Sequence, residues 1–306
     1  MRGTQAAGHV ARGESVTGVR GLERDGGGAG ASAARYALWA LYAFTAMALA
    51  GYASFGTHPE LLARYPGAAG FYGVSFLFFA RVQILLAGAA IALFLAVYAG
   101  RRWLGAFAAL YVISLGSELL GTTAGIPFGA YAYTEALGPR WFGHVPLLIP
   151  LSWFFMAVPS YALARGLLPI GSRTWERVLL ASFVLLSWDL SLDPAMSHAT
   201  RYWEWASPGP YYGMPLLNLF GWYATGAALM GALAALRADA WVERLPLGWL
   251  TGFYAANLLL PLGMILARGY WPAALVTVAA LGAAVLLARL RAPRRRATLA
   301  TAEAAT

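Results

Sequence analysis

Three carboxyl side chains lie inside apolar segments of the sequence, where ionisable groups are rare. Glu118 lies in the run Trp103–Ala124, and Asp189 and Asp193 lie in the run Val178–Met196. On insertion scales, each such group costs about 2.5–3.5 kcal/mol at the centre of a membrane helix. Three such acids in one chain are therefore unfavourable unless they serve a purpose. We interpret them as a polar site in which the acids donate and accept protons.

A purely structural explanation would pair these acids with polar neighbours at the same depth. Glu118 lies roughly 9 Å below the end of its helix at 1.5 Å per residue, and Arg81, Gln83 and Asn218 reach a similar level. Asp189 and Asp193 are four residues apart and share one helix face. One arginine cannot neutralise three acids, so we expect at least one carboxyl group to hold a proton.

Two aromatic pairs lie in loop segments rich in glycine and proline. They are Tyr131 with Tyr133, and Trp203 with Trp205. If these loops fold back over the mouth of a helix bundle, the rings line a flat apolar pocket that tolerates positive charge.

The composition places these residues in a membrane. Hydrophobic residues make up 60% of the 306 residues and charged residues 11%, against about 25% charged in soluble proteins. Cysteine is absent, which excludes disulfides and thiolate chemistry. The net charge of +9 comes from arginines that flank apolar runs, so it reflects membrane topology rather than nucleic-acid binding.

Eight apolar runs predict an all-α integral membrane protein with about eight spans, each near the ~20 residues that a bilayer core requires. They are Tyr36–Phe55, Phe71–Gly100, Trp103–Ala124, Val145–Ala164, Val178–Met196, Tyr211–Leu236, Leu245–Ala267 and Gly269–Ala288. We expect a disordered tail at 1–34, a single transmembrane domain at 35–290 and a basic tail at 291–306. Arginines collect at alternate ends of the runs, which predicts that both termini are cytoplasmic. The loops 56–72, 125–144 and 197–213 then face outward.

The middle of the chain contains a duplicated pattern. Val145–Trp153 and Met214–Trp222 both read Pro-Leu-Leu, then four residues, then Trp, and each follows an aromatic pair and a buried acid. This pattern predicts that the third and fourth helices and the fifth and sixth are parallel copies of one hairpin, related by an axis along the membrane normal.

About a third of the chain, from Glu118 to Trp222, resembles the membrane-embedded carotenoid 1,2-hydratases of the CruF type. The segments that carry the resemblance are Glu118–Gly121, Gly125–Tyr133, Gly143–Pro146, Trp188–Asp189, Asp193–Pro194 and Tyr211–Trp222. The resemblance implies an enzyme of carotenoid biosynthesis, a hydro-lyase that adds water across the terminal C1–C2 double bond of an acyclic carotenoid end, of the lycopene, γ-carotene or C50 type.

This chemistry suits the buried residues. Hydrating an alkene needs an acid that protonates one carbon and a base that positions water, and an apolar site can keep a carboxylic acid neutral until it donates its proton. We assign catalysis to Glu118 or Asp189 as the acid, with Asp193 or the other carboxylate holding water. Substrate contacts are expected from Tyr131, Tyr133, Trp203, Trp205, Arg81, Asn218, Trp153 and Trp222.

No metal or other cofactor is required for this reaction. The expected partners are an acyclic carotenoid dissolved in the bilayer, water and other carotenoid-pathway enzymes, with no nucleic acid. The expected location is the inner (cytoplasmic) membrane.

Two other functions fit parts of the pattern. Aspartates four residues apart can hold Mg²⁺ against a diphosphate, which suggests an intramembrane prenyltransferase, although the third helix offers only Glu118. A non-enzymatic lipid transporter or scaffold could use the acids as a proton relay and the two hairpins as rocking halves.

Overall fold

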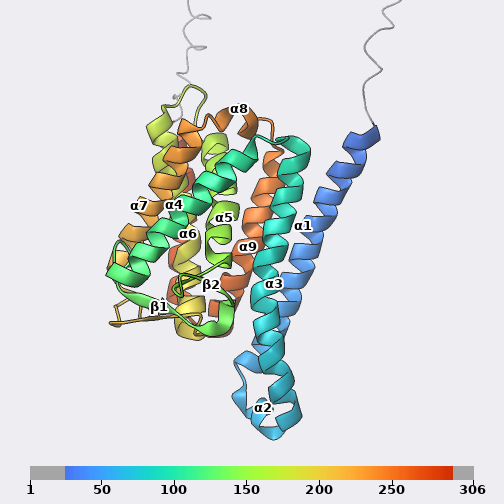
Figure 1. Cartoon of the computed structure of the whole chain (residues 1–306), viewed down its shortest axis with the longest axis vertical. Coiled ribbons are helices and arrows are strands. Elements are labelled where there is room, and N and C mark those ends of the chain that lie inside the picture. The colour runs from blue at the N-terminus through green and yellow to red at the C-terminus, as the bar shows by residue number, and fades with distance from the viewer. Residues whose placement is uncertain (1–24, 292–306) are drawn as a thin grey trace, which may run out of the picture.

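The computed structural model describes residues 25–291, which form a helical bundle (Figure 1). Eight helices of 20 residues or more lie in this part of the chain: α1 (Asp25–Gly51), α3 (Pro66–Tyr98), α4 (Trp103–Ala124), α5 (Leu148–Leu167), α6 (Thr174–Asp193), α7 (Leu216–Ala235), α9 (Leu247–Ala267) and α10 (Trp271–Arg291). The short helices are η1 (Tyr52–Gly56), α2 (Pro59–Arg64), η2 (Glu135–Leu137), η3 (Pro194–Ala199) and α8 (Asp239–Val242). The strands are β1 (Tyr131–Tyr133), β2 (Arg140–Trp141), β3 (Val145–Pro146) and β4 (Trp203–Trp205).

The all-α membrane fold is confirmed by helices of the required length and apolarity. Seven of the long helices in the described residues could cross a membrane by these two measures. The remaining long helix is α5, which contacts α3, α4, α6 and α9 and buries most of its side chains. A helix surrounded by other helices does not need a lipid-facing surface, so its lower hydropathy is compatible with a span. The number of crossings stays a prediction.

The first helix begins earlier than the sequence analysis predicted. Residues 25–34 were expected to belong to a disordered tail, but α1 begins at Asp25. Close packing explains the difference: a Cβ on Gly30 would lie 3.0 Å from Val97 of α3, and the Ala34 carbonyl accepts a hydrogen bond from Trp249 Nε1 at 3.0 Å. Tertiary contacts therefore extend a helix that glycine disfavours locally. Residues 1–24 and 292–306 of the two predicted tails lie outside the described residues.

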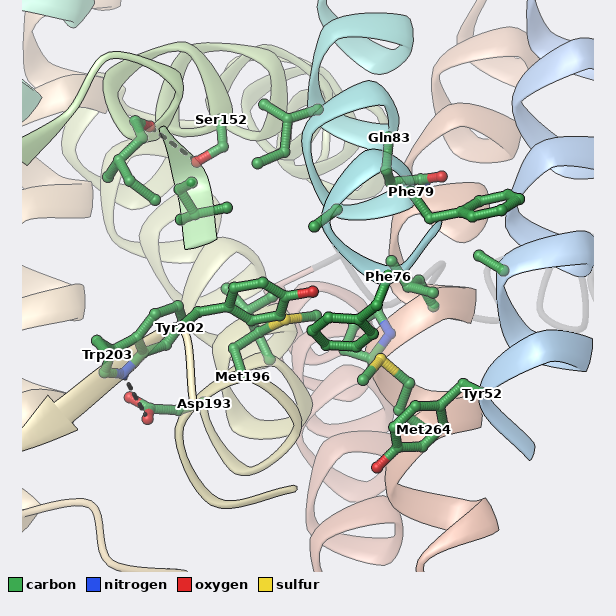
Figure 2. Close-up of a pocket in the computed structure, with 18 of the residues that line it drawn as sticks. Tyr52, Phe76, Phe79, Gln83, Ser152, Asp193, Met196, Tyr202, Trp203 and Met264 are labelled. Atoms are coloured by element: carbon green, nitrogen blue, oxygen red, sulfur yellow. Dashed lines mark hydrogen bonds between the residues drawn. The ribbon is translucent and has the colours of Figure 1, made fainter. Parts of the chain in front are cut away.

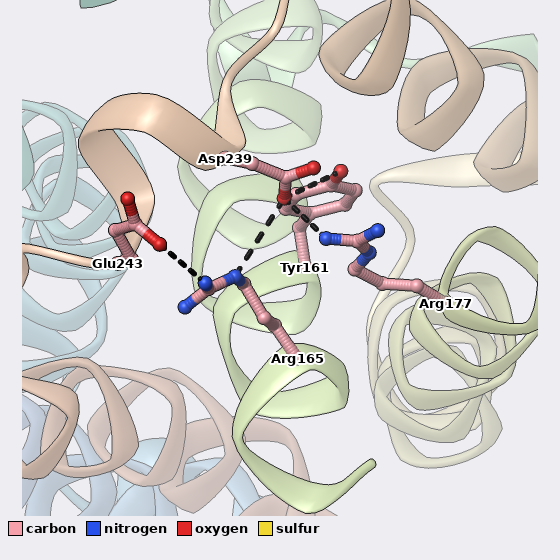
Figure 3. Close-up of polar contacts among 5 residues, drawn as sticks. All are labelled: Tyr161, Arg165, Arg177, Asp239 and Glu243. Carbon is pink, nitrogen blue, oxygen red and sulfur yellow. Dashed lines mark hydrogen bonds and ion pairs between the residues drawn. The ribbon is translucent and has the colours of Figure 1, made fainter. Parts of the chain in front are cut away.

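A cluster of ion pairs joins α5, α6 and α8 at one end of the bundle (Figure 3). Asp239 accepts hydrogen bonds from Arg177 and, at 3.1 Å, from the Tyr161 hydroxyl. Arg165 donates to Glu243 at 2.6 Å. Arg165 of α5 and Arg177 of α6, on either side of the loop that joins these helices, therefore hold α8 against them.

Both ends of the described chain lie at this same end of the bundle. Trp249, near the start of α9 and soon after α8, donates a hydrogen bond to the carbonyl of Ala34 in the first half of α1. At the other terminus, Arg291 of α10 forms an ion pair of 3.2 Å with Glu176 at the start of α6. This arrangement agrees with an even number of crossings. Which end faces the cytoplasm stays a prediction.

At the opposite end, the two predicted outer loops meet in a small antiparallel sheet. Strands β1 and β4 pair with the register Tyr131 opposite Trp205 and Tyr133 opposite Trp203. Their side chains point back toward α4, α5 and α6, because alternate residues of a strand face the same side. A second pair, β2 with β3, precedes α5. The paired loops close one end of the bundle over the acids.

Candidate active site

Glu118 lies on α4 beneath the β1–β4 sheet and accepts three hydrogen bonds. Trp153 Nε1 of α5 donates to its Oε1 at 2.8 Å, and the Tyr133 hydroxyl donates to Oε2 at 2.8 Å. The Tyr131 hydroxyl also donates to Oε2. Close approach of the loop to α4 is possible because Gly121 has no side chain: a Cβ there would lie 2.9 Å from the Tyr131 ring. Three donors stabilise the carboxylate that remains after Glu118 loses a proton.

Asp193 ends α6 and receives donors from three different elements. Ser197 Oγ of η3 donates to its Oδ1 at 2.8 Å, and Trp203 Nε1 of β4 donates to the same oxygen at 3.2 Å. Asn218 Nδ2 of α7 donates to Oδ2 at 2.7 Å. The same amide nitrogen lies 3.2 Å from Asp189 Oδ2. Asn218 therefore links the two aspartates that share one face of α6.

Asp189 has a poorer set of partners than Asp193. Its side chain is fully buried, and Oδ1 has no hydrogen-bond partner among the described residues. A buried ionised carboxylate needs several donors to offset the loss of water. With a single donor at 3.2 Å, an ionised Asp189 would be stabilised less than an ionised Glu118 or Asp193.

The three acids are deeply buried and form no ion pair with the described part of the chain. Their relative exposures are 4% for Glu118, 0% for Asp189 and 1% for Asp193. Within residues 25–291, no arginine forms an ion pair with any of them. Three ionised groups cannot share such a site without counter-ions, so at least one of the acids holds a proton.

The two predicted aromatic pairs connect the acids to one another. Tyr133, which binds Glu118, contacts Trp203, which binds Asp193, with ring centroids 6.0 Å apart. Burial raises the pKa of Tyr133 well above its usual value, and the neighbouring Glu118 adds to the effect. The pKa of Tyr131 is raised for the same two reasons. Both phenols therefore stay protonated and keep donating to Glu118.

A cavity of about 390 Å³ opens beside this network. Glu118, Asp193 and all four loop aromatics line it, whereas Asp189 does not. Figure 2 shows Asp193 with Trp203 on one side of the cavity, Tyr52 and Met264 on the other, and Phe76 with Tyr202 between them. The stacked indoles of Trp153 and Trp222, with centroids 4.0 Å apart, complete the wall near the acids. Two carboxyl groups thus face one aromatic chamber.

Arg81 is the one predicted site residue that lies apart from the others. Its Nε donates to the Ala136 carbonyl at 2.8 Å and its Nη2 to the Glu135 carbonyl at 3.2 Å. It makes no contact with the acids and does not line their cavity. Equal depth in the membrane was a poor guide here, because rotation about the α3 axis directs Arg81 toward the 125–144 loop instead.

Sequence reasoning missed two polar residues of the site. Ser197 binds Asp193, and Asn257 of α9 lines the cavity with its Nδ2 bonded to the Phe253 carbonyl at 2.9 Å. Gln83, which the sequence placed at the level of the acids, also lines the cavity and bonds to Thr45 at 3.0 Å. An asparagine in the middle of the apolar run that became α9 was the one available signal for that helix.

Comparison with known proteins identifies the family. The carotenoid biosynthesis protein family matches residues 78–284, which is more than half of the chain and includes all three acids. The chain belongs to this family. No solved structure matches it significantly.

A curated relative of this carotenoid biosynthesis protein is the bisanhydrobacterioruberin hydratase of Haloarcula japonica. The two are 35% identical over 125 residues, which is 40% of this chain and 41% of the relative. The match therefore spans about two-fifths of the relative's length.

Proposed function

We propose that this protein is a hydratase that adds water across the terminal C1–C2 double bond of an acyclic carotenoid end, giving a tertiary alcohol. The observation that carries the proposal is that Glu118 and Asp193 both line one buried aromatic cavity. Membership of a carotenoid biosynthesis family and the name of the curated relative support the same reaction.

Glu118 is the proton donor in this proposal. Its carboxyl group transfers a proton to the less substituted alkene carbon, and the alkene π electrons form the new C–H bond. Tyr131, Tyr133 and Trp153 then stabilise the Glu118 carboxylate through their hydrogen bonds. A donor whose conjugate base is stabilised in advance is a stronger acid, as protonation of an unactivated alkene requires.

Asp193 is the base that positions water. The tertiary cation left at the other alkene carbon lies among ring faces, which attract positive charge without reacting with it. Water adds its oxygen to that carbon and gives one proton to the Asp193 carboxylate. Return of this proton to Glu118 restores the site, so the net change is the addition of one water molecule. Asp189, behind Asn218, supports Asp193 from outside the cavity.

The proposal is tested by expressing the protein in a lycopene-producing bacterium and measuring the pigments by mass spectrometry. A mass gain of one water per acyclic end is expected. Strains that instead accumulate a γ-carotene-like or C50 substrate extend the test to the other acyclic ends. Unchanged pigments in all three strains, with the protein present in the membrane, would overturn the proposal.

Chelation and transport assays distinguish the hydratase from a prenyltransferase and from a lipid transporter. A prenyltransferase that holds a diphosphate through Mg²⁺ would lose activity in EDTA, whereas proton transfer from Glu118 to an alkene should continue. Proton-coupled uptake of a lipid by proteoliposomes, without any change in its mass, would instead support a transporter.

A further inference from the structure

The cavity is closed at the acid end and open at the other. Near the acids, Trp153 is 1% exposed and Tyr131 is 7% exposed. At the far end, the lining residues Met47, Phe55 and Phe71 are 56%, 40% and 76% exposed. The cavity therefore has a mouth, formed by the end of α1, by η1 and by the start of α3, where those two long helices extend beyond the rest of the bundle (Figure 1).

Exposed apolar side chains surround the mouth, which suits an opening onto lipid. Large apolar side chains exposed at the surface of a membrane helix face the acyl chains. A volume of about 390 Å³ lies at the lower end of the roughly 300–1,000 Å³ that pockets for small ligands occupy. A long isoprenoid whose end reaches Glu118 must therefore extend out through this mouth into the bilayer.

One face of α3 forms a continuous wall between the mouth and the acids. Tyr72, Phe76, Phe79 and Gln83 recur at spacings of three or four residues, so they share one side of the helix, and all of them line the cavity. Phe76 stacks on Tyr202 with ring centroids 5.5 Å apart, at the midpoint of the cavity in Figure 2. The aromatic rings of Tyr72, Phe76 and Phe79 form a row that we call the ring ladder. Such a row is the surface expected to bind a flat polyene.

The opposite side of the mouth is fixed by a bond between α9 and η1. Arg268 Nε, next to the end of α9, donates to the Tyr52 hydroxyl at 3.0 Å. Gly56 allows Tyr52 and Tyr72 to approach each other: a Cβ at this position would lie 2.6 Å from the Tyr52 ring and 2.6 Å from the Tyr72 hydroxyl. The width of the mouth thus depends on a glycine and two tyrosines.

We propose that this mouth and the ring ladder of α3 form the site that selects the substrate by the part of its isoprenoid chain beyond the reacting end. The inference rests on the proposed hydratase function. The acids lie inside the family match at residues 78–284, whereas Tyr52, Phe55, Gly56 and Phe71 precede it. The reacting acids therefore belong to the segment that matches the family. The entrance is formed at the α1–η1–α2–α3 hairpin.

The test compares two substrates that share one acyclic end and differ only in the distal part of the chain. One is linear throughout, and the other carries a ring at its far end. For the full chain in lipid nanodiscs, the ratio of kcat/KM for the two substrates is measured in wild type, Phe55→Ala, Phe71→Ala and Gly56→Ala. Loss or displacement of an aromatic contact is expected to change this ratio by about 3- to 10-fold in each variant.

The matched control is Phe78→Ala. Phe78 lies two turns beyond Phe71 on α3 and is 55% exposed, but it does not line the cavity. Its removal should leave the ratio unchanged. If the three mouth variants keep the wild-type ratio, or if the control changes it equally, the mouth does not select the substrate, although the hydratase function stands. If wild type hydrates neither substrate, the hydratase function fails, and this inference fails with it.

Discussion

Tyr133 and Trp203 lie directly opposite each other across the β1–β4 pair, and their polar atoms bind different acids. The Tyr133 hydroxyl donates to Glu118 and the Trp203 indole donates to Asp193. The position of one carboxyl group is therefore coupled to that of the other through two rings and a pair of short strands. This coupling supports the proposal that the two acids act as one catalytic unit.

Removing either donor should impair catalysis without unfolding the bundle. Tyr133→Phe and Trp203→Phe each delete one hydrogen bond to a carboxylate, an interaction worth about 1.5–3 kcal/mol, so the hydration rate should fall by about 10- to 100-fold. The double variant should lose less than the product of the two single effects, because residues of one network are not independent. Steady-state kinetics of the four proteins measure this coupling. Strictly multiplicative losses would show that the strands do not couple the acids.

Trp153 and Trp222 provide a second comparison, since they stack on each other but only Trp153 binds an acid. Trp153→Phe keeps an aromatic ring and removes a donor to Glu118, so kcat should fall by about 10-fold or more. Trp222→Phe keeps both the stack and the Glu118 hydrogen bonds, and its effect should be smaller. Equal losses in the two variants would indicate that packing, rather than the hydrogen bond to Glu118, is what matters.

Asn218 should be important for stability as well as activity. Its Nδ2 lies 2.7 Å from Asp193 Oδ2 and 3.2 Å from Asp189 Oδ2. Asn218→Leu removes the shared donor from two buried carboxyl groups, which should lower the free energy of unfolding by about 1–3 kcal/mol. Thermal unfolding in detergent measures the change.

The accompanying control is Asp189→Asn, which removes an acid that does not line the cavity. It should retain more activity than Asp193→Asn, and it should partly restore stability when combined with Asn218→Leu. If Asp189→Asn abolished hydration as completely as Asp193→Asn, Asp189 would have a direct role in proton transfer.

The two loop tyrosines predict a pH dependence at the alkaline end. Burial raises the pKa of Tyr131 and Tyr133 well above their usual value of 10.0. The folded protein therefore holds these protons more tightly than the unfolded chain. Their contribution to stability is fully present below about pH 10 and is lost as the pH rises above it toward the folded-state pKa.

Unfolding midpoints measured between about pH 7 and about pH 11 should be flat at first and then decline. The double variant Tyr131→Phe/Tyr133→Phe should decline less steeply above about pH 10 than wild type. The pKa of Tyr202 and the pKa of Tyr211 are also raised by burial, so some decline should remain. A slope identical to wild type would mean that the two phenols do not titrate with unfolding.

The sequence predicted the helices well because hydropathy is a local property. The run Trp103–Ala124 became α4 with the same bounds, and each of the other apolar runs overlaps one long helix. The start of α1 was predicted eleven residues too late, because contacts of Gly30 and Ala34 with distant helices extend it. Such contacts cannot be read from a single segment.

The candidate site was only partly accessible from sequence for the same reason. The number of residues from the end of a helix gives the depth of a side chain in the membrane. On this basis Glu118, Asp193 and Asn218 were predicted to lie at one depth. Depth does not give rotation about the helix axis, which is why Arg81 was grouped with the acids although it binds the carbonyls of Glu135 and Ala136. The cavity mouth arises from three helices and had no sequence signal at all.

The most direct test of the central claim, that the buried acids add water to the substrate, uses water enriched in heavy oxygen. Purified wild type and Glu118→Gln, which keeps the size of the side chain but cannot donate the same proton, are incubated with an acyclic carotenoid in nanodiscs. Wild type should form an alcohol that carries the heavy oxygen, and Glu118→Gln should form none while remaining folded and membrane-inserted. Full incorporation by the variant, or an alcohol without the label in wild type, would contradict the claim.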